Sequence, residues 1–432
     1  MCGFVVYPTG KNPESIIRNI EYRGLPEFIG HREFEGFTFA HIALPFVNLD
    51  PDIAIQPVGD DFPGVFVGEI FNFDTEKYET DAQQIHDDFF YGEFGFESFM
   101  NYDGFFTYVT VMGDYLFGIT DHLGIKPLYY RTDMEAMASE IDVLKLFGPV
   151  TIDETFMSNT LKWGYSPDPR TPFNEIKQLP PGHFIHQGVI HNYWDWKKVK
   201  TDTLYNDMKR SVVSRLSGQR EVSMLLSGGL DSSIIHGLLK EIGHDITCIH
   251  VENHEKDFAH LVSDNLVEVT LDDVSDEEAV SIHQSPVDLG SVKPQIAMAR
   301  KLHELGFHAV MTGDGADELF GGYRRAKEYD SQYSDTFSEL PYYHLPKLDR
   351  TMMRYTVELR APFLAPYIIK HALETPYSMR NGEKKILKET FKDIVPKEII
   401  DREKHPLKTD QIRKDPIEQR KRNDRIFRLK ME

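Results

Sequence analysis

Cysteine is scarce in this sequence, with only Cys2 and Cys248 among 432 residues. Two thiols cannot build a disulfide framework or a cysteine-based zinc site, so both classes of protein are excluded. We expect a reducing, cytoplasmic setting. Cys248 lies in the apolar run ITCIHV, where we expect it to pack as a small hydrophobic residue.

Long apolar runs and clustered positive charge are also missing. No stretch approaches the roughly 20 apolar residues of a membrane span, and the start of the chain lacks the pattern of a secretory signal. Lys and Arg number 48 against 69 Asp and Glu, which gives a net charge of −21. Binding to nucleic acid or anionic lipid needs basic clusters, so we expect neither partner. The length allows two or three domains.

The first half of the chain, to about residue 196, has the pattern of antiparallel sheets. Short runs of alternating aromatic and β-branched residues, such as GVFVGEIFNF and GFFTYVTVMGDYLFGITD, are bounded by turn residues and predict strands and hairpins. Helices are expected at 81–90 and after Ser139. The polar stretch around 195–203 is a suitable linker.

The second half alternates strand and helix. EVSMLL, ITCIHVE, LVEVTL and HAVMTG are predicted strands, and helical spacing fills the segments that end at the glycines 243 and 306. This alternation predicts a parallel sheet covered by helices, with ligands at the carboxyl ends of its strands. After Gly322 we expect mostly helix, ending in a charged, frayed helix at QRKRNDRIFRLK.

The motif SGGLDSS, residues 227–233, stands between a predicted strand and a predicted helix. Its glycines allow a tight turn whose N–H groups can bind a phosphate, and the helix N-terminus adds positive dipole. Asp231 supplies a carboxylate for a magnesium ion. No Lys-Ser/Thr pair follows, so this is not a Walker loop; it resembles the loop of enzymes that split ATP into AMP and pyrophosphate. The alternative is a turn that only caps a helix.

A second motif, TGDGADELFGGY, follows the last predicted strand. Asp314, Asp317 and Glu318 are spaced three and four apart, so we expect them to project from one face of a helical turn. Three close carboxylates suit a cation or a general base. The alternative is an acidic first turn that favours the helix dipole.

Cys2 follows the initiator methionine in MCGF. Removal of Met1 would leave an N-terminal thiol beside an α-amine able to accept its proton. A cysteine at this position can also be chance.

Together these motifs resemble the asparagine synthetase family, in which a class II glutamine amidotransferase domain precedes an ATP-pyrophosphatase synthetase domain. The resemblance runs nearly end to end. The runs that carry it are MCGF, YRGLPE, VGEIFNF, ITDHLGIKPLYY, LPPGHF, LLSGGLDSS, GDGADELFGGY, LPKLDRTMMRYTVELRAPFL and GEKKILKETF.

The resemblance implies the architecture. Residues 1–196 would form an Ntn-type αββα sandwich, and the chain as a whole would belong to the α/β and α+β classes. Residues 200–432 would form a doubly wound parallel-sheet domain with a helical C-terminal part. A homodimer is a further expectation.

The resemblance also implies an activity and roles for single residues. A carboxylate, aspartate in the namesake, would be adenylated by ATP with Mg²⁺ and converted to an amide by ammonia, released from glutamine and passed through the protein. Cys2, Gly68, Asp314 and Lys384 would be catalytic, and Glu69 and Asp81 would bind glutamine. Asp231 and Asp317 would face magnesium. The residues expected to bind ATP are Leu225, Ser227, Gly228, Gly229, Asp231, Ser232 and Gly313.

Departures from the family cluster in the glutamine pocket. Ala43 stands where the family has an Arg that holds the glutamine carboxylate, and Val67 stands where it has an Asn that donates to the oxyanion. Losing one such donor costs about a hundred- to a thousandfold in rate. Either the glutaminase is degraded and free ammonia is used, or glutamine binds in a changed pose, with Arg23 or Arg32 as a substitute clamp.

The acceptor is open as well. Residues 283–295 occupy the place of the family's substrate pocket and keep Ser291 and Pro294, without an added Arg for an aspartate carboxylate. Asp314 replaces a Glu found in many members. Three alternatives stay open. They are a relative that closes a ring with an internal amine, a tRNA-modifying enzyme, and a scaffold without catalytic activity. Retention of Cys2 favours amide formation, the charge disfavours RNA, and retention of the loop glycines and acids disfavours a scaffold.

Overall fold

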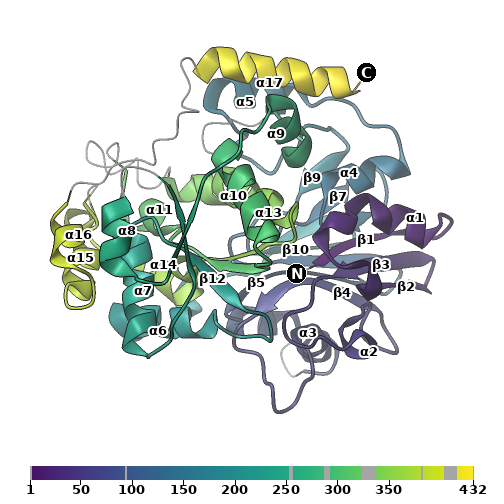
Figure 1. Ribbon diagram of the computed structural model, residues 1–432. Coiled ribbons are helices and arrows are strands. Elements are labelled where there is room, and N and C mark those ends of the chain that lie inside the picture. The colour runs from purple at the N-terminus through teal and green to yellow at the C-terminus, as the bar shows by residue number, and fades with distance from the viewer. Residues whose placement is uncertain are drawn as a thin grey trace.

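The computed structural model describes residues 2–92, 95–252, 256–286, 292–323, 336–380, 383–402 and 416–431. Within these residues the chain forms two antiparallel sheets and then one parallel sheet, each flanked by helices (Figure 1). The predicted change from antiparallel strands to strand–helix alternation is therefore confirmed.

The two antiparallel sheets both come from the first half. The six-stranded sheet has the order β2 (Ile29–Phe34), β3 (Phe37–Ala43), β1 (Cys2–Pro8), β8 (Met137–Ala138), β7 (Tyr129–Arg131) and β9 (Ile176–Gln178). The five-stranded sheet has the order β11 (Val189–Asn192), β10 (His183–His186), β6 (Tyr115–Thr120), β5 (Gly104–Met112) and β4 (Gly64–Ile70).

These sheets pack face to face between helices. Phe4 and Val6 of β1 share a buried cluster with Val65 and Val67 of β4. The helices α1 (Pro13–Ile17), α4 (Ile141–Leu144) and α5 (Glu154–Trp163) pack on the outer face of the six-stranded sheet. The helix α3 (Asp81–Phe90) covers the other sheet with the 3-10 segment η3 (Gly95–Asn101). This layering is the predicted αββα sandwich.

The parallel sheet has five strands in the order β14 (Leu266–Val269), β13 (Cys248–Val251), β12 (Val222–Leu225), β15 (Ala309–Met311) and β16 (Glu358–Arg360). The chain starts at β12, moves outward to β14, and then crosses to β15 on the other side of β12. The strand order therefore reverses between β12 and β15, which is where such sheets bind ligands. Strand β16 was not predicted, because its short sequence ELR carries buried charges instead of an apolar pattern.

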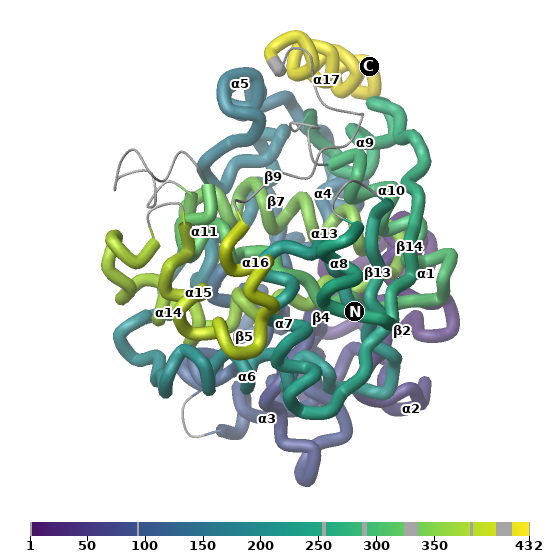
Figure 2. The backbone as a smooth tube through the Cα atoms, turned by 60° about the vertical axis from the view of Figure 1, so that its left-hand side comes forward, coloured from purple at the N-terminus to yellow at the C-terminus, as the bar shows by residue number. Residues whose placement is uncertain are grey.

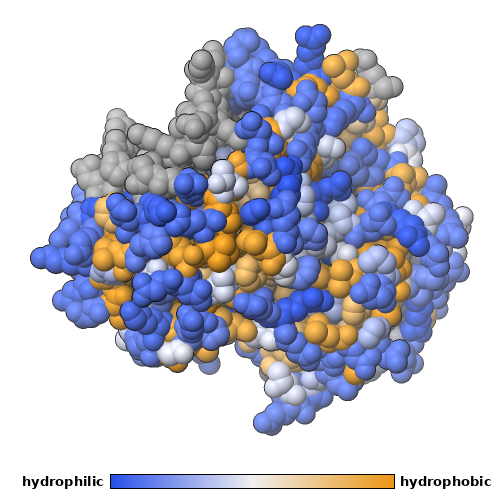
Figure 3. Space-filling view, in the orientation of Figure 1, coloured by the Kyte–Doolittle hydropathy of each residue, from blue (hydrophilic) through white to orange (hydrophobic). Residues whose placement is uncertain are grey.

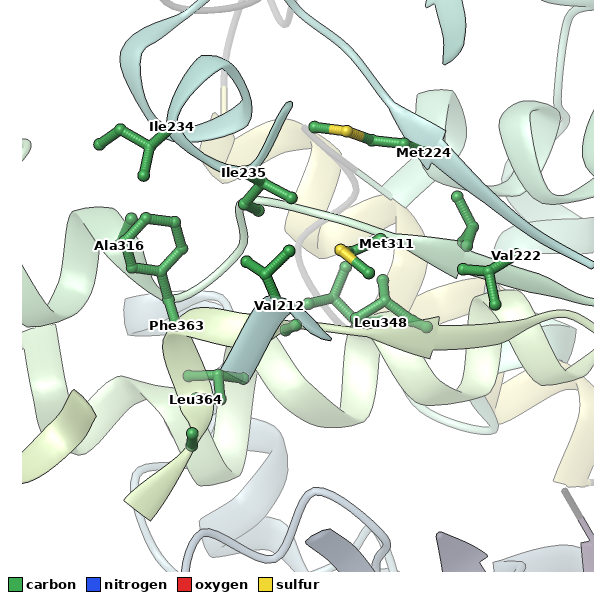
Figure 4. Packing of buried hydrophobic residues seen from close by; sticks show 14 of the residues in the cluster. Val212, Val222, Met224, Ile234, Ile235, Met311, Ala316, Leu348, Phe363 and Leu364 are labelled. Atoms are coloured by element: carbon green, nitrogen blue, oxygen red, sulfur yellow. The ribbon is translucent and has the colours of Figure 1, made fainter. Parts of the chain in front are cut away.

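Helices surround the parallel sheet in two groups. One group contains α6 (Leu204–Ser214), α7 (Leu230–Glu241) and α14 (Pro366–Glu374), and the other contains α9 (Asp276–His283), α10 (Val292–Glu304) and α13 (Leu345–Met353). Figure 4 shows Met224 of β12 and Met311 of β15 packed near Ile235 of α7 and Leu348 of α13. Burial of such large apolar side chains is the main stabilising contribution to this core.

The two halves share one hydrophobic core. Leu44, Phe105 and Ile125 of the first half belong to the same buried cluster as the parallel sheet. Arg215 of the second half also donates to both carboxylate oxygens of Asp103, at 2.8 and 2.7 Å. A buried apolar contact reinforced by a bidentate ion pair fixes the halves against each other.

The last helix, α17 (Pro416–Met431), packs against α5 and α9, as Figures 1 and 2 both show. Phe427 is buried there, and Arg428 forms an ion pair with Glu154 at 2.8 Å. The prediction of a frayed terminal helix was therefore wrong, because its few apolar side chains find a partner in the distant first half.

The remaining helices of the described residues are short. They are α2 (Pro51–Ala54), α8 (Lys256–Val262), α11 (Ala316–Phe320), α15 (Lys385–Phe391) and α16 (Lys397–Asp401). Polar residues cover most of the face seen in Figure 3, with separate hydrophobic patches between them. No helix of the described ranges has the length and apolar character to cross a membrane.

Candidate active sites

The SGGLDSS loop connects the central strand of the parallel sheet to a helix. Strand β12 ends at Leu225, and α7 begins at Leu230 after the cap residue Gly229. Among the described residues no side chain caps this helix end, so the first turn of α7 can present backbone N–H groups to an anion. Gly228 has a φ of +73°, and a Cβ there would lie 2.8 Å from the backbone N of Ala259. Glycine is therefore required for this turn.

The serine hydroxyls of the loop form hydrogen bonds within the loop itself. Ser227 Oγ lies 3.2 Å from Ser232 Oγ and accepts a hydrogen bond from the N–H of Gly229, also at 3.2 Å. Ser233 Oγ donates to the Gly229 carbonyl at 2.7 Å. These short-range hydrogen bonds stabilise the turn that follows the strand.

The second motif lies against the first. A Cβ on Gly313, just after β15, would lie 2.9 Å from the Cβ of Asp231, so the two loops touch at the point where the strand order reverses. The predicted ATP-binding residues of the two motifs are thus neighbours. The glycine at 313 is what permits this approach.

A lysine joins the two motifs. Lys384 Nζ lies 2.6 Å from both carboxylate oxygens of Asp231 and 2.5 Å from Asp317 Oδ1. Burial by itself would lower the pKa of Lys384, but the two carboxylates outweigh it and raise that pKa. The structure thus places a positive charge between the two side chains predicted to face magnesium.

The three acids of the second motif do not share one face. Only Asp317 and Glu318 lie in α11, and Asp314 precedes the helix. Glu318 accepts from Tyr323 and lies 3.5 Å from His344 Nδ1, whereas Asp314 accepts from Thr312 at 2.7 Å. The one-face prediction was wrong, because the helix starts at Ala316 after Gly315 in a left-handed conformation.

The surroundings of Asp314 shift its pKa. Burial raises its pKa, although the Thr312 hydrogen bond opposes the shift. The buried Lys347 of α13 faces it, and burial lowers the pKa of that lysine. Sequence reasoning missed Lys347, which stands in the LPKLDR part of the run that carried the family resemblance.

A magnesium ion fits this arrangement best when a substrate adds oxygen ligands to the two carboxylates. Within the described ranges, no group of three or more His, Cys, Asp or Glu side chains converges as a metal site. Asp231 and Asp317 do lie close together, because both carboxylates contact Lys384. Magnesium is commonly held by one or two carboxylates together with phosphate oxygens, so these residues suit the ion when a nucleotide is bound.

The second site surrounds Cys2, at the start of β1. A cavity there is lined by the thiol together with Gly68, Glu69 and Asp81. The burial of Cys2 raises the pKa of its thiol, and a hydrogen bond from the Leu44 backbone opposes that shift. Gly68 has a φ of +140°, and a Cβ there would meet the Phe105 carbonyl at 2.0 Å, so no other residue fits.

The two acids of this cavity are buried. Asp81 accepts from the N–H of Ile70 at 3.1 Å, yet burial raises the pKa of Asp81 to about 6. Burial and the nearby Glu358 raise the pKa of Glu69 well above its usual range. Both acids would gain from an added cation.

The residues that depart from the family lie beside the same cavity. Ala43 lines it and pairs with Cys2 across the sheet, and Val67 precedes Gly68 in β4 with 1% of its surface exposed. Neither side chain can donate a hydrogen bond.

Both arginines considered as substitute clamps are engaged elsewhere. Arg23 donates to the Cys2 carbonyl, Glu140 and Asp349 at 3.1, 2.5 and 3.1 Å. Arg32 donates to the carbonyls of Gly59 and Asp60.

One arginine of the second half does reach this site. Arg360 of β16 is fully buried, pairs with Glu358 at 2.7 Å and lies 3.5 Å from Glu69. Sequence reasoning missed it, although the run VELRAPFL was noted as part of the family resemblance. Glu69 is thus tied to the parallel-sheet half.

A further cavity lies where the halves meet. Phe105 and Ile125 line it from the first half, and Leu348 and Leu364 from the second, with Lys126 and Asp349 paired at its wall. Its lining is mostly apolar.

Part of the predicted acceptor pocket falls outside the described residues, including Ser291. Pro294 is buried in α10 and His283 is buried at the end of α9.

Comparison with known proteins accounts for both halves. Residues 1–194 match the glutamine amidotransferase domain family, and residues 203–339 and 325–427 match the asparagine synthase family. Asparagine synthetase B (glutamine-hydrolyzing) of Escherichia coli is 26% identical, covering 91% of this chain and 78% of its own length.

Two other relatives carry different names. Asparagine synthetase 2 (glutamine-hydrolyzing) of Oryza sativa is 23% identical, covering 90% of this chain and 72% of its own length. Amidase chry2 of Gibberella zeae is 25% identical over 69% of this chain and 52% of its own length. The chain belongs to the asparagine synthase family, with a glutamine amidotransferase domain ahead of the asparagine synthase domain.

Proposed function

We propose that this protein is an ATP-dependent amide-forming ligase that adenylates a carboxylate, aspartate as the first candidate, and converts it to an amide with ammonia. The observation that carries this proposal is the meeting of Asp231 and Asp317 on Lys384 at the reversal of strand order. This is where a doubly wound sheet binds its ligand.

Each group of that site has a distinct task in the proposal. The N-terminus of α7 and the turn at Gly228 and Gly229 bind phosphate oxygens through backbone N–H groups. Asp231 and Asp317 hold magnesium, which supplies charge neutralisation at the leaving pyrophosphate. As the bond to the leaving pyrophosphate breaks, Lys384 moves away from the two carboxylates and contacts the negative charge that develops on the phosphate.

We assign the acceptor carboxylate to the neighbourhood of Asp314 and Lys347, two buried groups that interact with each other. We assign Asp314 the part of the base that takes a proton from the attacking ammonia. Its raised pKa makes it a better proton acceptor than an ordinary Asp.

The Cys2 site is the proposed ammonia source. The thiol attacks an amide carbon, and Gly68 contributes a backbone donor to the oxyanion. Glu69 and Asp81 hold the substrate's amine. The mostly apolar cavity between the halves supports passage of neutral ammonia, because the charged side chains at its wall are already paired, Lys126 with Asp349 and Arg215 with Asp103.

A second candidate keeps the ligase but takes ammonia from solution. It is favoured by Ala43 and Val67, which remove a cation and a donor from the Cys2 cavity, and by the engagement of Arg23 and Arg32 elsewhere. The two candidates differ only in the nitrogen source.

Pyrophosphate release tests the proposal. The purified chain is supplied with ATP, Mg²⁺ and one of several carboxylates, with ammonia or with glutamine as the nitrogen source. We expect release with ammonia, its loss in Asp231→Ala, and its retention in Cys2→Ala. Absence of release with every carboxylate would refute the ligase; release with ammonia alone would favour the second candidate.

A further inference from the structure

The cavity beside Cys2 has an uneven charge distribution. Its described lining contains two carboxylates, Glu69 and Asp81, and neutral polar groups such as Asn48 and Thr80, but no Lys, Arg or His side chain. A site that binds a zwitterion normally offers groups of both signs. The charged side chains of this lining are all negative, and the other charged group expected beside them is the α-amine that removal of Met1 would leave on Cys2.

Glu69 is poised for a cation. Its side chain is almost wholly buried, and Arg360 Nη2 lies 3.5 Å from its carboxylate. Arg360 meanwhile pairs more closely with Glu358 at 2.7 Å. Arg360 and the N-terminal amine, which acts on both Glu69 and Asp81, are thus the cations near three carboxylates, Glu69, Asp81 and Glu358. The cavity keeps an excess of negative charge that an ammonium group would neutralise.

The apolar part of the lining does not suit a carboxylate. The wall next to Ala43 continues through Phe46, Val47, Ile53 and Ala54, all apolar. A carboxylate placed there would lose water without gaining a partner, and it would be repelled by the two acids. Arg23 and Arg32 cannot approach it without giving up the acceptors they already bind.

We infer that the cavity selects a primary amide that carries a cationic amine and no free carboxylate, such as glutamine whose α-carboxyl group is itself an amide. This inference rests on the proposed chemistry of Cys2 and names the substrate class for it. The ammonium end lies on Glu69 and Asp81, and the neutral end lies against the apolar wall.

The reaction balances with water as the only co-reactant. Cys2 Sγ forms a bond to the side-chain carbonyl carbon, the C–N bond breaks, and the leaving nitrogen departs as ammonia with the proton of the thiol. Water then hydrolyses the thioester, which releases a γ-carboxylate and restores the thiol.

Ammonia release from the full-length chain tests the inference, with glutaminamide and glutamine compared as substrates. A carboxylate without its charged partner is disfavoured by at least about tenfold in affinity. We therefore expect kcat/KM for glutaminamide to exceed that for glutamine by at least about tenfold. Binding of both compounds to Cys2→Ala, measured by calorimetry, should show the same preference without turnover.

Substitution at residue 43 provides a matched pair of variants. Ala43→Arg should shift the preference toward glutamine, because it restores a cation at the apolar wall. Ala43→Met has similar length without charge and should leave the preference for glutaminamide in place. Circular dichroism verifies that both variants fold.

Each outcome separates this inference from the ligase. Equal or better use of glutamine by the wild-type chain overturns the inference, and so does failure of Cys2→Ala to bind glutaminamide. Pyrophosphate release with ammonia is measured on the same preparation. Release without an amide preference leaves the ligase standing alone, whereas an amide preference without release supports the cavity's selectivity and refutes the ligase.

Discussion

Replacing Lys384 with methionine should destabilise the parallel-sheet half, and magnesium should restore part of the loss. Lys384 is 4% exposed, and its Nζ lies within 2.6 Å of Asp231 and Asp317. Methionine keeps the length of the side chain but removes the charge. The two carboxylates then face each other without a cation.

The magnitude follows from burial. Removing one partner of a buried ion pair costs about 3–5 kcal/mol. The two aspartate side chains retain 21% and 22% exposure, so water offsets part of the repulsion and we expect the lower end, about 3 kcal/mol. At about 2–4 °C per kcal/mol for a unit of this size, Tm should fall by about 6–12 °C.

Thermal unfolding followed by circular dichroism measures this effect, in EDTA and then in MgCl₂, without nucleotide. Magnesium should raise the Tm of Lys384→Met more than that of the wild type, since in the wild type the ion must displace the lysine. Lys388→Met is the control, because Lys388 lies one turn further along α15 and forms no ion pair with described residues. An unchanged Tm in EDTA, or equal magnesium shifts in both chains, would refute the reasoning.

Three further predictions concern the loops, the acids and the contact between the halves. Gly313→Ala should raise the KM for ATP by about tenfold or more in the pyrophosphate assay, because its Cβ would meet Asp231 at 2.9 Å; an unchanged KM would contradict the proposed nucleotide site. The affinity of Cys2→Ala for glutaminamide should fall as the pH drops through about 6, where Asp81 gains a proton and loses the charge that holds an ammonium group; calorimetry at pH 5 and pH 8 tests this, and equal affinities would contradict it. Arg215→Met should lower stability by about 3–5 kcal/mol in urea unfolding, since it leaves Asp103 buried without its bidentate partner, and a wild-type midpoint would show that this pair contributes little.

Local sequence was sufficient to predict the structure of a segment where the residues that determine it lie within that segment. The helix at 81–90 begins and ends as predicted, because Thr80 and Gln83 form a capping box at its start. The SGGLDSS turn follows from glycines that permit a positive φ and a strand and helix that flank it. These features depend on residues a few positions apart, so pattern and spacing reveal them.

Long-range contacts escaped the same reasoning. Strand β16 carries a buried Glu and Arg instead of apolar side chains, and its arginine finds Glu69 across the contact between the halves. The two acids of α11 contact different distant residues, Asp317 with Lys384 and Glu318 with His344. No local period encodes which distant cation an acid will meet.

The amino-acid sequence by itself determined most of the strands and helices and the two loops that end β12 and β15, because each follows from backbone preferences and hydrophobic periodicity over short windows. Only the tertiary structure decided how charge is distributed: Lys384 between two aspartates, Arg360 behind Glu69, and a Cys2 cavity without a basic side chain in its described lining. The physical reason is that burial strengthens electrostatic interactions, and burial is fixed only when segments far apart in the chain pack together.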